Sequence, residues 1–97
     1  MNLHVDAQFI RAQIERRWQF DGGREREMVV QIRLRITADG VVESAQIVDD
    51  RATDAAFHAA AIGARNAALL SSPLQLPPGI FLAGDITVDL NTKDAVR

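Results

Sequence analysis

The chain contains no cysteine, only three prolines, few aromatic residues and no large surplus of charge of either sign. Without cysteine it forms no disulfide, no thiolate metal site and no thiol nucleophile. A net charge of −2 provides no basic surface for nucleic acid, since phosphate binding needs clustered Lys and Arg. No run reaches the roughly 20 apolar residues that cross a bilayer. The 97 residues are therefore expected to form one small soluble domain.

The side chains that could carry chemistry are scattered along the chain. His4 and His58 have no nearby partner ligands in the sequence, and we interpret both as solvated. Asp49, Asp50 and Asp54 come closest to a carboxylate cluster, but acids are also typical of a loop and a helix N-terminus. The serines lack an evident base and orienting acid. We expect no enzymatic activity, no metal and no cofactor.

Hydrophobic spacing predicts two amphipathic helices, from about Val5 to Trp18 and from Thr53 to Leu69. The expected buried stripes are Phe9, Ile10, Ile14 and Trp18 in the first, and Phe57, Ala61, Ala64 and Ala68 in the second. Asp6 is a candidate N-cap for the first helix, and Thr53 or Asp54 for the second. Trp18 fits a core role better than a role as a binding aromatic, because it falls on the apolar stripe.

Alternation with a period of two predicts three strands, Met28 to Thr37, Val41 to Val48 and Ile80 to Leu90. In the third strand, Ile86, Val88 and Leu90 are expected to face inward, and Asp85, Thr87 and Asp89 outward. The proline-rich run from Ser71 to Gly79 breaks regular structure and forms a stiff, extended connector. A polar tail is expected from about Asn91.

The Asp39-Gly40 pair indicates a hairpin between the first two strands, and two registers are open. A two-residue loop would turn Glu43 toward the core and bury a charge. A three-residue loop, Ala38 to Gly40, places Val42 inward opposite Ile36, and a one-residue bulge near Ser44 then restores the later register. We favour the second register.

These elements predict an α+β fold with the topology α-β-β-α-β. The helical crossover makes the second and third strands parallel to each other, and the hairpin makes the first two antiparallel. A three-stranded antiparallel sheet in the order 2-1-3 satisfies both conditions, with the two helices packed on one face and the other face left to solvent. Both outer strands have open edges, and the third strand is the longer and more regular of the two.

Four segments, in this order, carry a resemblance to a known family: Phe9–Trp18, Asp39–Val48, Asp54–Phe57 with the Ala-rich helix, and Pro73–Pro78. The chain resembles, over nearly its whole length, the C-terminal periplasmic domain shared by TolA and TonB. The Glu-Arg-Arg-Trp end of the first helix and the Pro-Leu-Gln-Leu-Pro-Pro connector look more like TolA. The Tyr-Pro start and the Trp-Arg-Phe-x-Pro end of many TonB domains are missing.

This resemblance implies a protein-binding role in the cell envelope. Such domains sit in the periplasm at the end of a long arm anchored in the inner membrane, and they pass force from a proton-driven motor complex to outer-membrane or periplasmic proteins. Neither arm nor anchor is present in this chain, so it would be an excised or a divergent stand-alone domain. The alternative is a generic envelope adaptor that uses the same fold without transducing force.

The expected binding mode is addition of a partner segment as an extra strand beside the third strand. An open edge presents unpaired amides and carbonyls that an extended peptide can satisfy, and homodimers through the edges are a further possibility. The residues expected at this edge are Phe81, Asp85, Ile86, Thr87, Val88 and Asp89. Phe81 either packs under the connector or contacts the partner.

Overall fold

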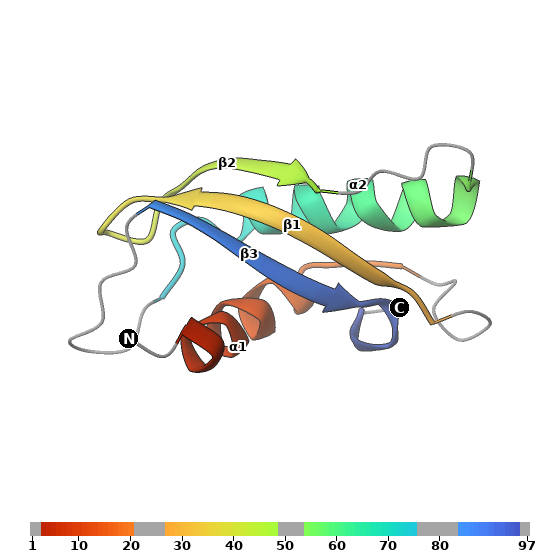
Figure 1. Cartoon of the computed structure of the whole chain (residues 1–97), viewed down its shortest axis with the longest axis horizontal. Coiled ribbons are helices and arrows are strands. Elements are labelled where there is room, and N and C mark those ends of the chain that lie inside the picture. The colour runs from red at the N-terminus through yellow and green to blue at the C-terminus, as the bar shows by residue number, and fades with distance from the viewer. Residues whose placement is uncertain (1–2, 21–26, 49–53, 76–83, 96–97) are drawn as a thin grey trace.

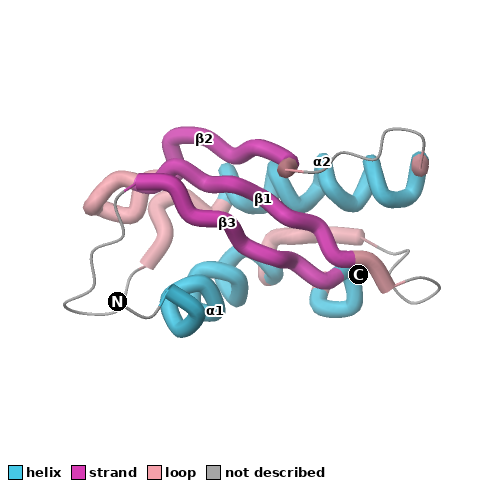
Figure 2. Tube along the Cα trace, in the orientation of Figure 1, coloured by secondary structure: helices cyan, strands magenta, loops and turns pink. Residues whose placement is uncertain are grey.

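The computed structural model describes residues 3–20, 27–48, 54–75 and 84–95. In chain order its elements are α1 (Leu3–Glu15), β1 (Val29–Ile36), β2 (Val42–Ile47), α2 (Ala55–Leu70), β3 (Gly84–Asn91) and a 3₁₀ helix, η2 (Thr92–Asp94). The strands form one antiparallel sheet in the order β2-β1-β3, and both α-helices lie on the same side of it (Figures 1 and 2). The predicted α+β fold and topology are confirmed.

The central strand β1 alternates between buried and exposed residues along its whole length. Val30, Ile32 and Leu34 are completely buried and face the helices, whereas the residues between them face solvent. Beneath the sheet, α2 packs against β1 and β2, and α1 packs against β3 and α2. The core is therefore one layer between a three-stranded sheet and two helices.

The β1–β2 hairpin has the three-residue loop and the bulge that the sequence favours. Ile36 pairs with Val42, whereas Arg35 pairs with Ser44, so Glu43 is the extra residue and its side chain remains exposed. The amide of Thr37 donates to the carbonyl of Val41 at 3.0 Å and closes the loop. The bulge thus keeps a carboxylate out of the core while Val42 enters it.

Helix α2 begins directly after Asp54, whose Oδ1 accepts a hydrogen bond from the amide of Phe57 at 3.1 Å. This confirms Asp54 as the N-cap. All four residues of the predicted stripe are buried: Phe57, Ala61, Ala64 and Ala68. Because most of this face is alanine, the helix backbone can lie close to β1 and β2.

Helix α1 differs from its prediction at both ends. It begins at Leu3, so Asp6 lies within the helix and is not its N-cap, and it ends at Glu15, before Trp18. Trp18 is nonetheless fully buried, and its Nε1 donates to the carbonyl of Ala60 at 3.2 Å. A buried indole N–H needs a hydrogen-bond acceptor. The chain leaves the helix after Glu15, and Trp18 then reaches the carbonyl of Ala60.

Phe9 does not belong to the buried stripe of α1, and this part of the prediction is wrong. Ile10 and Ile14 are fully buried, whereas Phe9 is 41% exposed. Adjacent helical residues point about 100° apart, so the stripe that buries Ile10 and Ile14 leaves Phe9 at its margin. The outcome leaves an aromatic ring at the surface of α1.

The residues after Asn91 do not form a polar tail within the described range, which ends at Ala95. Thr92 is 2% exposed, and it extends the pairing of β1 with β3 by two hydrogen bonds. Its amide donates to the carbonyl of Met28 at 2.9 Å, and its Oγ1 accepts from the amide of Met28 at 2.9 Å. A buried threonine is tolerated here because both of these polar groups are satisfied.

The start of the proline-rich connector is tied to the hairpin. Leu74 is buried, and its amide donates to the carbonyl of Gly40 at 2.7 Å. Gly40 has a φ of +88°, and a Cβ at this position would clash with the carbonyl oxygen of Leu74. Both conditions favour glycine. The rest of the connector and the predicted start of the third strand, residues 76–83, lie outside the described residues.

Replacing Trp18 with alanine tests the core. We expect Trp18→Ala to lower the free energy of unfolding by about 3–5 kcal/mol, because it empties a large buried volume and orphans the carbonyl of Ala60. Phe9→Ala is the matched control and should cost much less, since that ring is partly exposed. Urea unfolding measures both. Equal losses for the two variants would contradict this assignment of the core.

Candidate protein-binding edge

The direction of each backbone group in β1 follows from two hydrogen bonds at its ends. The amide of Val48, just after β2, donates to the carbonyl of Gln31 at 3.0 Å, so the backbone amide and carbonyl of Gln31 point toward β2. The amide of Thr92 donates to the carbonyl of Met28, so the backbone amide and carbonyl of Met28 point toward β3. Backbone groups alternate in direction along a strand. Odd-numbered residues of β1 therefore bond toward β2, and even-numbered residues bond toward β3.

The same alternation assigns the backbone groups of β3. Ile86 pairs with Leu34, and Val88 pairs with Ile32. The backbone groups of Leu34 and Ile32 point toward β3, so the amides and carbonyls of Ile86 and Val88 bond inward to β1. The intervening residues of β3 point their amides and carbonyls away from the sheet. These outward-facing residues are Asp85, Thr87 and Asp89, followed by Asn91 at the last position of the strand. The free edge of the sheet thus carries pairs of backbone groups in a regular row.

The structure places five of the six predicted edge residues on β3. Asp85, Thr87 and Asp89 have exposed side chains on the solvent face, as predicted. Ile86 is half-buried and Val88 is buried, so both serve the core. The sixth, Phe81, lies outside the described residues.

Asp85 also takes part in a contact across the solvent face. The Nε of Arg35 on β1 lies 3.2 Å from Oδ1 of Asp85, and both side chains are more than half exposed. An ion pair this exposed contributes little to stability. It does partly neutralise one of the two carboxylates on the edge strand.

The opposite edge, formed by β2, is less suited to pairing with another strand. It has six residues against eight in β3, and the bulge at Glu43 interrupts its row of backbone groups. At its start, the outward-facing amide of Val42 already donates to Oγ of Ser72 at 3.0 Å. Bulges and covering groups of this kind are common protections of edge strands. Of the two edges, β3 is the more continuous.

One end of the β3 edge is approached by α1. Nη1 of Arg11 donates to the outward-facing carbonyl of Asp89 at 3.5 Å, which is a long hydrogen bond. No sequence pattern predicts this contact, because it joins residues 78 positions apart. The edge from Gly84 to Thr87 is left clear of any such contact among the described residues.

A carboxyl group with a shifted pKa lies near the same end. Burial, together with the adjacent Asp94 carboxyl of η2, raises the pKa of Glu15 to about 7, and Arg11 offsets part of the shift. A hydrogen bond between the two carboxyl groups contributes to the shift and is made when Glu15 is protonated. The pair therefore stabilises the contact between α1 and the C-terminal 3₁₀ helix best at acidic pH.

The other chemical candidates from the sequence form no site among the described residues. Asp54 is occupied as the N-cap of α2, and His58 is half-buried on that helix. His4 has no described side chain, and Asp49 and Asp50 are outside the described ranges. Within those ranges no three metal-binding side chains gather, and no helix is long and apolar enough to cross a membrane.

Comparison of the chain with protein-family models, curated proteins and solved structures finds no match. The likeness to the TolA/TonB domain therefore rests on the motifs of the sequence and their order.

The pKa of Glu15 predicts a measurable pH dependence. The pKa of Glu15 is about 7 in the folded state and 4.5 in the unfolded chain, so the folded state binds this proton more tightly. The resulting stabilisation of the fold is complete below about pH 4.5 and is lost as the pH rises through about 7. We expect Glu15→Gln to remove this loss and to be more stable than the wild type at pH 8, but not at pH 4. Urea unfolding across this range measures the difference. Glu43→Gln, at an exposed carboxylate, is the control.

Wild-type and Glu15→Gln proteins whose free energies of unfolding run parallel from pH 4 to pH 8 would show that Glu15 titrates alike in both states.

Proposed function

We propose that this chain is a non-enzymatic protein-binding domain that accepts an extended segment of a partner as an additional strand beside β3. The observation that carries the proposal is the row of outward-facing amides and carbonyls at Asp85, Thr87 and Asp89. Backbone groups of this kind bind any extended peptide that brings matching donors and acceptors. Each net hydrogen bond contributes about 0.5–1.5 kcal/mol, so several are needed for useful affinity.

Side chains on the edge strand select among partners. The side chains of Asp85, Thr87 and Asp89 lie on the solvent face of the sheet. The side chains of an added strand would lie beside them on that face. Two carboxylates favour lysine or arginine at the neighbouring positions of the partner and disfavour acids.

The physiological role follows from the resemblance of the sequence to TolA and TonB. The domain then works in the periplasm as the terminal part of an inner-membrane-anchored transducer, and it links a proton-driven motor to outer-membrane or periplasmic proteins. Strand addition suits this work, since a force along an added strand is shared by its whole row of hydrogen bonds. The α-β-β-α-β topology and the order of the motifs support this assignment.

Substitution of Thr87 with proline tests strand addition. Proline removes an amide that faces outward, so Thr87→Pro should remain folded, as edge strands tolerate proline at such positions. We expect its affinity for a 12-residue peptide, selected from a yeast-displayed random library on the wild-type domain, to fall about three- to tenfold, as for one lost hydrogen bond. Fluorescence anisotropy measures the affinity, and circular dichroism checks the fold.

Two further variants complete the test. Thr87→Ala keeps the amide and should bind the peptide nearly as well as the wild type. Val88→Pro removes an amide that bonds to β1 and should destabilise the fold itself. If Thr87→Pro is folded and its affinity is unchanged, the partner does not pair with β3, and the β2 edge or the connector becomes the binding site.

A further inference from the structure

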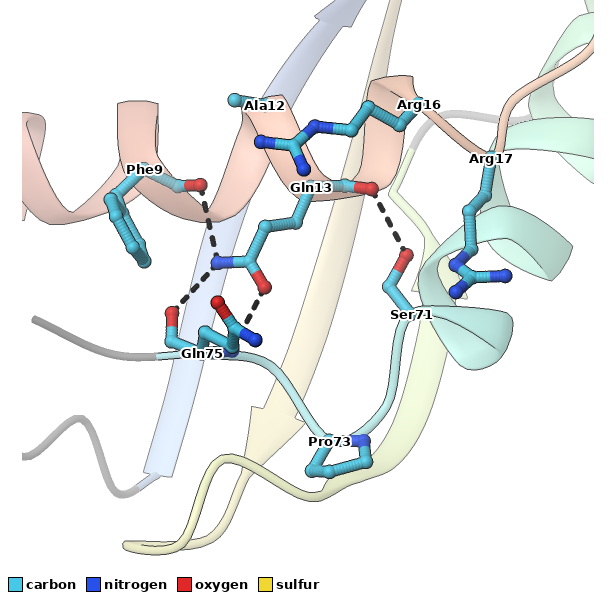
Figure 3. Close-up of a pocket in the computed structure, with 8 residues that line it drawn as sticks. All are labelled: Phe9, Ala12, Gln13, Arg16, Arg17, Ser71, Pro73 and Gln75. Atoms are coloured by element: carbon cyan, nitrogen blue, oxygen red, sulfur yellow. Dashed lines mark hydrogen bonds between the residues drawn. The ribbon is translucent and has the colours of Figure 1, made fainter.

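A cleft of about 600 Å³ opens between α1 and the chain that follows α2 (Figure 3). Its walls include an exposed aromatic ring, a proline and two arginines, and its main lining residues are Phe9, Gln13, Arg16, Arg17, Pro73 and Gln75. The volume falls in the range of small-ligand sites. It does not include the outward-facing residues of β3, so it is a separate surface from the proposed strand-binding edge.

The side chain of Gln13 fixes the shape of this cleft. Its Nε2 donates to the carbonyl of Gln75 at 2.7 Å, and its Oε1 accepts from the amide of Gln75 at 2.8 Å. The side-chain amide thus pairs with the connector backbone as a strand would, and Figure 3 shows it reaching from the helix to the connector. On the same helix, the carbonyl of Gln13 lies 3.3 Å from Oγ of Ser71, whose single hydroxyl proton is shared with the nearer carbonyl of Ala67 at 2.7 Å. These bonds hold α1 and the connector at a fixed separation.

The cleft is cationic, although the whole chain carries a net charge of −2. Arg16 and Arg17 are exposed, and neither forms an ion pair with a carboxylate of the described residues. Among the lining residues that the structure describes, none is acidic. The two guanidinium groups are therefore available to a ligand, and a negatively charged ligand is the one they favour.

We infer that this cleft binds a short acidic segment of a partner protein. Carboxylates of the segment pair with Arg16 and Arg17, for which the planar guanidinium is well suited. An adjacent apolar side chain of the segment packs against Phe9 and Pro73, both exposed in the free domain. The site acts independently of strand addition at β3, so the two interactions are separable by substitution.

A protein segment fits the cleft better than a nucleic acid. Two arginines are few for a phosphate backbone, and the net negative charge of the chain repels a long polyanion. The apolar side chains Phe9 and Pro73 offer nothing to a free phosphate but give an apolar peptide side chain a surface to cover. Charge and apolar contact together point to a peptide that contains both carboxylates and an apolar residue.

A bead-bound library of capped random hexapeptides tests the inference. We expect the wild-type domain to enrich peptides with at least two carboxylates and an apolar residue. Arg16→Gln with Arg17→Gln should lose this enrichment and bind the best such peptide about tenfold more weakly or worse, because the charge-assisted bonds are gone. Arg33→Gln with Arg65→Gln makes the same charge change elsewhere and should bind like the wild type. Melting temperatures check that each variant is folded.

Nuclear magnetic resonance places the bound peptide. The side-chain amide signals of Gln13 and the backbone amide signal of Gln75 should shift on titration, whereas those of Asp85, Thr87 and Asp89 should not. The inference is overturned if no acidic peptide is enriched, if the Arg16/Arg17 variant binds as well as the wild type, or if the control variant loses binding equally. Displacement by inorganic phosphate or by a short single-stranded DNA at equal concentration would identify a general anion site instead.

Discussion

The strict alternation of β1 is the constraint on which the rest of the structure depends. From Met28 to Ile36 every second side chain is apolar and buried. Only one face of the strand can therefore pack against the helices. Its two neighbours must then match that face. In β3 this couples side-chain and backbone directions: residues with buried side chains, such as Val88, bond to β1, and residues with solvent-facing side chains, such as Thr87, point their amides to the free edge.

The sequence predicts those parts of the fold that a single local pattern decides. The period of two in β1, the Asp39-Gly40 turn and the cost of burying Glu43 together determine the hairpin register, and the structure confirms it. The errors fall where tertiary contacts decide. Phe9 sits at the margin of a helix whose buried stripe depends on how α1 docks, and Thr92 is buried because its hydroxyl and amide find Met28, far away in the sequence.

The candidate site was predictable to a similar extent. Alternation identifies Asp85, Thr87 and Asp89 as solvent-facing, but the direction of their amides depends on the hydrogen-bond phase between strands, which the two end contacts of β1 supply. The groups that protect the other edge and approach this one, Ser72 and Arg11, come from distant segments. The Gln13–Gln75 bridge is hidden for the same reason.

Amide hydrogen exchange in the free domain tests the central claim most directly, because it needs no partner. The open β3 edge predicts that the amides of Asp85, Thr87 and Asp89 exchange rapidly, while those of Ile86, Val88 and Leu90 exchange slowly, at rates set by opening of the sheet. This alternation along one strand is the signature of a lone edge. Equal, strong protection of both sets would contradict the account, since it would mean that the β3 edge is already paired or that the hydrogen-bond phase is reversed.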